Sequence, residues 1–235
     1  RLEGEHKYLP STVYAMHRDL ITEAVALGLS ADQRETYLQA RQAILTRARR
    51  FRVGEGYESD DTVVFYGREA FSEYYQFPED GYFVKSPKSF LGGSGLRAEH
   101  IAFFEDIVAL MMLNVKRRSE VSTGQELTHT VIGRPVNFQG LDAQESNAQA
   151  LDVLSVAAKR AGFNSVEFQY EPVAAGFEYE ATLTETQKVL VVDIGGGTTE
   201  IAIISLNGIV YSDSVRVGGD RFDEAIVSHV RRKYG

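Results

Sequence analysis

Asp193 is followed by three glycines and two threonines, and this group lies between two runs of apolar residues. The runs, Val189–Val192 and Ile201–Ile204, have the length and β-branched content of buried strands. Glycines at Gly195–Gly197 allow a ligand oxygen to approach the main chain closely, and successive amide groups in such a turn can bind an anion. A carboxylate beside that anion could hold a cation or a water molecule. The stretch therefore predicts a site for phosphate and metal together, as in a bound nucleotide.

A glycine triplet alone has a second interpretation, because glycine is also the residue that most easily allows a hairpin to turn. Two other phosphate-binding loops do not fit the sequence. A dinucleotide-binding loop needs a third glycine where Glu200 stands, and it needs a helix next, whereas a strand-like run follows. A P-loop needs Gly-Lys-Ser or Gly-Lys-Thr, which the chain lacks. The acidic residue before the triplet and the hydroxyl groups after it favour phosphate binding over a simple turn.

Two further places could contribute to such a site. Glu171 lies where a predicted strand meets a predicted helix, and Pro172 is typical of a first helical turn. Its alternative role is structural, since a carboxylate there stabilises the helix dipole. Gly218 and Gly219 precede another predicted helix. They could let an anion approach that helix, or they could form only a tight turn.

The composition limits the classes of protein that this chain could be. With 235 residues, 43% of them hydrophobic and 25% charged, we expect one or two globular domains. The net charge of -8 argues against a general nucleic-acid or membrane-surface binder. The chain has no cysteine, no secretory signal and no apolar run long enough to span a membrane. We therefore expect a cytoplasmic protein that has no nucleic-acid partner.

Apolar spacing and turn residues predict an α/β order of elements. Strands are expected at 62–66, 81–84, 129–135, 166–170 and 209–215, besides the two that flank the glycines. Helices are expected from Ser30 to an arginine cluster, from Gly67, from Ile101 to Arg118, from Ala143 to Ala161, from Pro172 and from Gly218. Asn207-Gly208 predicts a hairpin turn. The arginine cluster (Arg47, Arg49, Arg50 and Arg52) is typical of a helix C-terminus, and a phosphate or partner site is the less favoured interpretation.

Several of these segments together resemble the nucleotide-binding domain of DnaK-type heat-shock chaperones, which belong to the actin-like ATPase superfamily. They are Thr130–Pro135, the helix that ends at Gly162, Glu171–Gly176, Asp193–Thr198 and Gly218–Asp223. The segments 83–92, 131–140 and 168–172 are most similar to YegD, a bacterial relative of these chaperones that lacks their substrate-binding part. The segments 192–200, 204–208 and 218–226 are closer to MreB, a bacterial actin. The two resemblances meet at the phosphate loop, as they would in a chimera.

The resemblance implies a role for each matching residue. Gly195, Gly196, Gly197, Thr198 and Thr199 would hold the phosphates of ATP or ADP. Asp193 would act through water bound to Mg²⁺, and Glu171 would position the attacking water. Gly218 and Gly219 would lie near the nucleotide. These roles suit phosphoryl transfer, which depends on positioning and on charge stabilisation.

The resemblance also implies an actin-like (ribonuclease H-like) α/β fold, with a mixed sheet, flanking helices and an incomplete second lobe. Residues 1–14 and 95–187 would form the core subdomain of the first lobe, 15–94 a smaller inserted subdomain, and 188–235 the start of the second lobe. A first phosphate loop and an adenosine-binding segment are missing from the sequence. Phe71 stands where the chaperones have a catalytic lysine, and neither Lys85 nor Lys88 is assigned in its place. We therefore expect a piece of a longer ATP hydrolase with reduced nucleotide affinity.

The function favoured at this point is the ATP-binding domain of a YegD-like protein of the chaperone class, with protein clients. The alternative is an MreB-like filament former that uses the same pocket for self-assembly and determines cell shape. The large segment 15–94 favours the chaperone class, because MreB has a compact lobe there. A sugar or acetate kinase of the same superfamily is a third interpretation, but no sugar-binding residues are evident.

Overall fold

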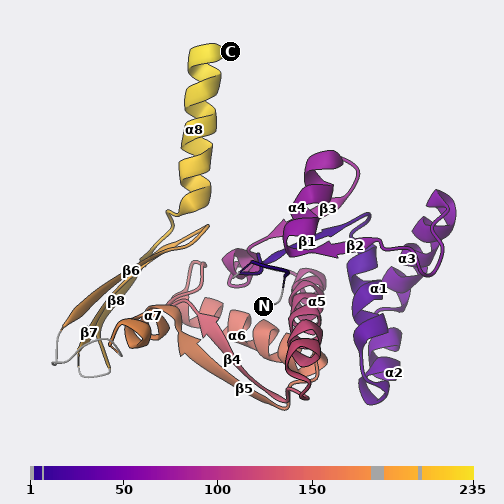
Figure 1. The fold of residues 1–235 in the computed structure, drawn as a ribbon, viewed down its shortest axis with the longest axis horizontal. Helices are drawn as coiled ribbons and strands as arrows, with labels where there is room; N and C mark the ends of the chain where they lie inside the picture. The colour runs from indigo at the N-terminus through magenta and orange to yellow at the C-terminus, as the bar shows by residue number, and fades with distance from the viewer. Residues whose placement is uncertain (1–2, 7, 181–187, 206–207) are drawn as a thin grey trace. The chain divides into compact units, whose positions relative to one another are not determined.

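The computed structural model describes residues 3–6, 8–180, 188–205 and 208–235 (Figure 1). The helices are α1 (Asp19–Gly28), α2 (Ala31–Ala40), α3 (Gln42–Glu55), α4 (Gly67–Gln76), α5 (Ala98–Thr123), α6 (Ala143–Arg160), α7 (Glu171–Glu180), α8 (Gly219–Tyr234) and the short 3-10 helix η1 (Pro87–Phe90). The strands are β1 (Thr12–Ala15), β2 (Val64–Tyr66), β3 (Tyr82–Lys85), β4 (His129–Arg134), β5 (Ser165–Tyr170), β6 (Val189–Ile194), β7 (Thr199–Ser205) and β8 (Gly208–Val215). The expected hairpin residue Asn207 lies outside the described residues.

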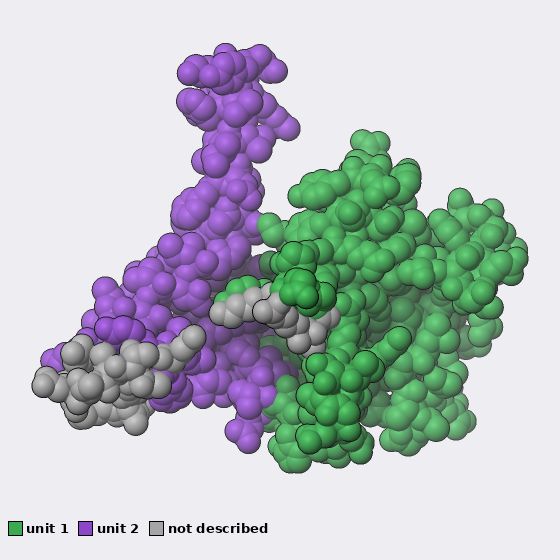
Figure 2. All heavy atoms as spheres, viewed as in Figure 1, with its two compact units in different colours: residues 1–87, 95–130, 151–166 green, residues 88–94, 131–150, 167–235 purple. Residues whose placement is uncertain are grey.

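The chain forms two compact units, coloured separately in Figure 2. Unit 1 comprises Arg1–Pro87, Gly95–Thr130 and Leu151–Val166, and unit 2 comprises Lys88–Ser94, Val131–Ala150 and Glu167–Gly235. Hydrogen-bonded strands in the described residues form three sheets, with the orders β2-β1-β3, β4-β5 and β6-β7-β8. The subdomain boundaries expected from the resemblance stay a prediction.

Unit 1 is built around the antiparallel sheet β2-β1-β3, in which Val13 of the central strand lies opposite Tyr66 and Val84. All four residues of β1 are buried, and α4 packs on β1 and β2. The helix α1 packs against α3 and α5 and contributes the fully buried Leu20 and Ile21 to the core. Apolar residues from strands and helices therefore share one core in this unit.

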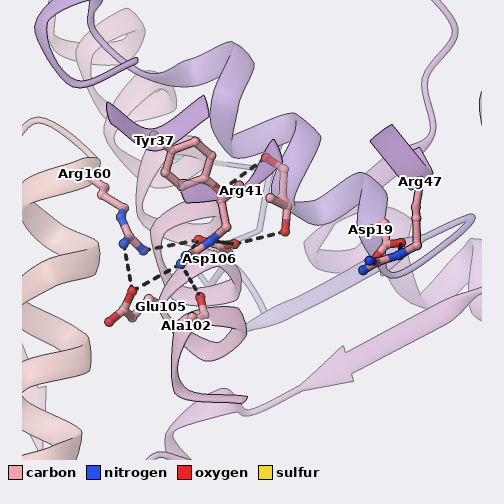
Figure 3. Close-up of polar contacts among 9 residues, drawn as sticks. Asp19, Tyr37, Arg41, Arg47, Ala102, Glu105, Asp106 and Arg160 are labelled. Carbon is pink, nitrogen blue, oxygen red and sulfur yellow. Dashed lines mark hydrogen bonds and ion pairs between the residues drawn. The ribbon is translucent and has the colours of Figure 1, made fainter. Parts of the chain in front are cut away.

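The helix expected from Ser30 is in fact two helices, α2 and α3, separated at Arg41. The guanidinium group of Arg41 donates from Nε to Oδ2 of Asp106 over 3.0 Å and from Nη2 to the carbonyl oxygen of Ala102 over 3.0 Å. Next to Asp106 on α5 is a second acidic residue, Glu105. Arg160, the last residue of α6, binds it with Nη2 2.8 Å from Oε2 (Figure 3). A buried polar cluster therefore ties the α2–α3 junction to α5 and α6.

The arginine cluster near the end of α3 is partly used for packing within unit 1. Arg47 donates from Nε to Oδ2 of Asp19 over 2.7 Å, and Arg52 donates to Oε2 of Glu23 over 2.6 Å. Both acceptors belong to α1, which the sequence analysis did not predict. These two arginines therefore hold α3 against α1 rather than simply ending a helix.

Two helix ends show how local sequence signals work in this chain. The helix α5 continues past Arg118 to Thr123, where Gly124 adopts a left-handed conformation (φ 68°) and ends it. The helix α6 begins as expected, because Oδ1 of Asp142 accepts the amide of Glu145 over 2.9 Å. Gly162, with φ 84°, follows its C-terminus as predicted. The end expected at Arg118 was wrong, and glycine marks the end of both helices.

Unit 2 contains the antiparallel sheet β6-β7-β8, with α7 packed on β6 and β7. Gly176 permits this packing, because a Cβ atom there would lie 2.4 Å from Cδ1 of Ile204. The helix α8 follows β8 and extends away from the sheet in Figure 1, and none of its residues is buried. No helix in the described part of the chain is long and apolar enough to cross a bilayer.

Candidate functional site

Asp193 lies near the end of β6 and is directly opposite Glu200 of β7 in the strand register. Residues alternate between the two faces of this sheet. On β6, Leu190 and Val192 are 63% and 52% exposed, whereas Asp193 is partly buried on the other face. On β7, the buried residues are Glu200, Ala202 and Ile204, the last of which meets α7. Asp193 and Glu200 therefore share the face of the sheet that α7 covers.

The predicted phosphate loop is a tight turn between β6 and β7. The amide of Gly195 donates to the carbonyl oxygen of Thr198 over 2.8 Å and closes the turn. Among the described residues, the amide groups of Gly196 and Gly197 have no hydrogen-bond acceptor. Unpaired neighbouring amide groups in a turn are the kind of group that binds an anion. The loop therefore has the donors that a phosphate would need.

Gly218 and Gly219 lie against this loop. The amide of Gly219 donates to the carbonyl oxygen of Gly195 over 2.9 Å, and that of Asp220 donates to Gly196 over 2.8 Å. A Cβ atom on Gly218 would lie 2.5 Å from the Gly195 oxygen and 2.6 Å from the Gly196 oxygen. The requirement for glycine is therefore strict at Gly218, where two segments of main chain touch.

The predicted hydroxyl groups differ in their surroundings. Thr199 donates its hydroxyl to the carbonyl oxygen of Val217 over 2.7 Å, which fastens the start of β7 to the segment before α8. Thr198 is partly buried, and its carbonyl oxygen closes the turn at Gly195. In this arrangement the Thr199 side chain supports the loop, whereas the roles expected for both threonines toward phosphate stay predictions.

Glu171 is the first residue of α7 and lies against Lys88 of η1. The Lys88 ammonium contacts Oε1 of Glu171 and donates to the carbonyl oxygen of Gly133 over 3.2 Å. Gly133 leaves room for the carboxylate, because a Cβ atom there would lie 3.1 Å from Oε1 of Glu171. Lys88 was not assigned from the sequence, since no spacing rule connects it to Glu171, 83 residues away.

The electrostatics of unit 2 connect the acidic residues. Burial raises the pKa of Asp193, the charge of Glu171 raises it further, and Lys88 opposes both effects. Burial likewise raises the pKa of Glu200 to about 7, with Glu171 and Asp193 acting in the same direction. The amide of Val136 and the charge of Lys88 lower it. Carboxyl groups whose pKa values are shifted by burial and by neighbouring charges are typical of functional sites.

Glu200 is the site residue that sequence reasoning missed. It is 3% exposed, and Oε2 accepts the amide of Val136 over 3.2 Å. Glu200 was used only to exclude a dinucleotide-binding loop. The available signal was the two-residue alternation of β7, which places Glu200 on the same face as Ala202 and Ile204.

The described residues contain no cluster of three or more His, Cys, Asp or Glu side chains that could hold a metal ion by themselves. Mg²⁺ commonly keeps several of its waters and binds through one or two carboxylates plus substrate phosphates. The partly buried carboxylate of Asp193, next to a turn with unpaired amide groups, is compatible with that mode of binding. The residues present thus fit a magnesium ion held through water and phosphate, rather than an all-protein metal site.

Comparison with known proteins identifies the family. A family model described as MreB/Mbl protein matches residues 95–235, more than half of the chain. The cell shape-determining protein MreB of Escherichia coli (strain K12) is 57% identical over 79 residues, which are 34% of this chain and 23% of that protein. The cell shape-determining protein Mbl of Bacillus subtilis (strain 168) is 40% identical over 78 residues, 33% of this chain and 23% of that protein. The chain therefore matches only about a quarter of these relatives' length.

A solved structure is similar in fold. The crystal structure of MreB5 of Spiroplasma citri bound to ADP aligns with a TM-score of 0.52 and 24% identity, and the alignment covers 74% of this chain and 47% of that one. This likeness confirms the actin-like α/β fold class. The chain spans less than half of the solved protein.

These findings contradict the function favoured from the sequence. The DnaK-type chaperone interpretation, with its heat-shock class and protein clients, was wrong, because the matching family model runs from residue 95 and includes the motifs assigned to chaperones. Those motifs, such as Glu171–Gly176 and Asp193–Thr198, were matched to both classes through a predicted phosphate site, so they could not separate the classes. The argument from segment 15–94 used residues that lie before the match. The actin-like ATPase superfamily is supported, and the chain belongs to the MreB/Mbl protein family.

Proposed function

We propose that this chain carries part of the nucleotide-phosphate site of an MreB-like actin, which binds ATP or ADP and self-assembles into filaments that determine cell shape. The observation that carries the proposal is the turn at Gly195–Thr198. Its unpaired amide groups at Gly196 and Gly197 lie in the same unit as the acidic residues Glu171 and Asp193. Membership in the MreB/Mbl family and the ADP bound to the Spiroplasma citri protein support the same interpretation.

The chain's own residues would divide the chemistry among them. The amide groups of the turn would bind phosphate oxygens, and Gly218 and Gly219 would keep the main chain close enough to support that turn. Glu171 would orient the attacking water, with Lys88 holding its carboxylate in place. Asp193 would hold water of a bound magnesium ion, which would neutralise charge on the phosphates.

The proposal is tested by equilibrium binding of a fluorescent ATP analogue in the presence and absence of Mg²⁺. We expect saturable binding by the wild type that unlabelled ATP and ADP displace. The variant Asp193→Asn should lose the dependence on Mg²⁺, because its carboxylate is the proposed ligand of the metal-bound water. The matched control is Glu167→Gln, an exposed carboxylate on β5. Absence of binding in the wild type at millimolar nucleotide would contradict the proposal.

Self-assembly needs its own measurement. Sedimentation of the protein with ATP and Mg²⁺, compared with the same protein without nucleotide, should move material into the pellet if the protein forms nucleotide-dependent filaments. Electron microscopy of the pellet separates filaments from aggregates. If the protein binds ATP but forms no nucleotide-dependent pellet over a wide range of protein concentration, the proposed phosphate site stands and the proposed filament assembly is contradicted.

A further inference from the structure

Glu200 is a buried carboxylate that the proposed chemistry does not use. It lies directly opposite Asp193, and like charges at opposite positions of neighbouring strands destabilise a sheet. Its side chain is nearly inaccessible, at 3% exposure, and Oε1 has no hydrogen-bond partner in the described part of the chain. Burial of an acidic group costs free energy where its oxygens lack hydrogen-bond partners, and among the described residues only Oε2 has one.

Among the described residues, the side chain of Glu200 has one hydrogen bond, and it leads to the segment that follows β4. Oε2 accepts the amide of Val136 over 3.2 Å. Three other contacts hold the same segment. Arg134 donates from Nη2 to the carbonyl oxygen of Val136 over 3.0 Å, the amide of Phe138 donates to Asn147, and Arg216 donates to the carbonyl oxygen of Gly140. The segment Val136–Gly140 is thus held at Val136, Phe138 and Gly140.

This segment brings a side-chain amide to the phosphate loop. Nε2 of Gln139 lies 3.4 Å from the position that a Cβ atom on Gly197 would occupy. Gln139 is partly buried, and its side chain has no hydrogen-bond partner among the described residues. An amide NH₂ group supplies two donors, and the main-chain amide of the neighbouring Gly197 is also unpaired among the described residues.

We propose that Gln139 donates its side-chain amide to a phosphate oxygen bound at Gly197, and that Glu200 is the residue that positions Gln139 by holding Val136. This inference rests on the proposed function and adds a phosphate-binding residue to it. Glu200 acts here as a hydrogen-bond acceptor, so its effect depends on the acceptor oxygen rather than on its charge.

The test measures the affinity for ATP in single and double variants of the whole chain. We expect Gln139→Ala to lower the affinity about tenfold, the size of a lost hydrogen bond to a charged group, and Gln139→Glu to lower it further through repulsion of phosphate. Glu200→Ala should have the effect of Gln139→Ala. The double variant should be no weaker than either single variant, because both changes remove one contact. Glu200→Gln keeps an acceptor oxygen, so its affinity for ATP should equal that of the wild type.

Hydrogen exchange gives a measurement that does not involve nucleotide. Glu200→Ala should increase exchange at the Val136 amide and leave the amides of the β6–β7 ladder protected, whereas Glu200→Gln should keep Val136 protected. Glu167→Gln, which changes an exposed carboxylate on β5, is the control for both experiments. Wild-type binding that Gln139→Ala and Glu200→Ala leave unchanged, or additive losses in the double variant, would overturn this inference alone. Absence of ATP binding in the wild type would overturn the proposed function and this inference with it.

Discussion

The Lys88 ammonium lies against the carboxylate of Glu171 and also donates to the carbonyl oxygen of Gly133 over 3.2 Å. Lys88 precedes the segment matched by the MreB/Mbl family model, whereas Glu171 lies within it. The same cation lowers the pKa values of Asp193 and Glu200, against the effect of burial. One lysine therefore holds Glu171 in place and limits the pKa shifts of two further carboxyl groups.

Replacing Lys88 by methionine should raise the pKa values of Asp193 and Glu200 above their values in the wild type. The reason is that burial and the repulsion from Glu171 would then act without an opposing cation. Carbon-13 NMR titration of the carboxyl groups measures both values. Lys159→Met, which changes an exposed lysine of unit 1, is the control and should leave both values unchanged. A titration curve of Asp193 that is the same in Lys88→Met and wild type would show that the contact does not act on this site.

Gly218→Ala should destabilise the protein by about 1–3 kcal/mol, because the new Cβ atom would overlap main-chain atoms that cannot move aside freely. The clash involves the carbonyl oxygens of Gly195 at 2.5 Å and Gly196 at 2.6 Å. The neighbouring Gly219→Ala is a sharp control, since its Cβ atom would lie 3.7 Å from the Gly195 oxygen, an ordinary contact. Urea unfolding measures both changes. Equal losses of stability in the two variants would contradict the close approach at Gly218.

Local signals in the sequence predicted the elements that depend on near neighbours. The helix α6 has its capping residue Asp142 and its terminal Gly162 within a turn of its ends, so both features could be predicted. The α2–α3 break could not be predicted, because Arg41 is held by Asp106, 65 residues away. The helix α1 was missed for a similar reason. Its acidic residues pair with arginines of α3, which the sequence placed only at a helix end.

The candidate site divides in the same way. Asp193 and the glycine turn are neighbours in the sequence, and their residue types predict phosphate binding. Lys88 and Glu200 act on the site through contacts that link positions 83 and 64 residues apart, and only the folded chain reveals them. The class of protein was mistaken because the contiguous motif is the part that related families share. A motif of this kind predicts chemistry better than it predicts the biological role of the whole protein.

Asp106 should be one of the most sensitive positions for stability in unit 1. It is fully buried and accepts hydrogen bonds from Thr22, Arg41 and Arg160. Asp106→Ala would leave two guanidinium groups without this acceptor, and breaking a buried ion pair typically costs about 3–5 kcal/mol. Glu99→Ala, which removes an exposed pair with Arg97, should cost about 1 kcal/mol or less. Urea unfolding compares them, and similar losses would show that the buried cluster is not a main source of stability.

Glu200 should make the protein less stable as the pH rises. Its pKa is about 7 in the folded chain against an ordinary value of 4.5, so between these values the folded state holds a proton that the unfolded state releases. The stabilisation is complete below pH 4.5 and is lost as the pH rises through 7, by up to about 3 kcal/mol. Glu171, Asp193 and Lys88 are the charged groups that act on it. The side chain of Gln cannot titrate. The unfolding free energy of Glu200→Gln should therefore fall less than that of the wild type between pH 5 and 8. The control Glu167→Gln, at an exposed position, should follow the wild type. Parallel curves for Glu200→Gln and wild type would mean that Glu200 is already ionised at pH 5, because a carboxylate that keeps its charge throughout this range contributes no slope.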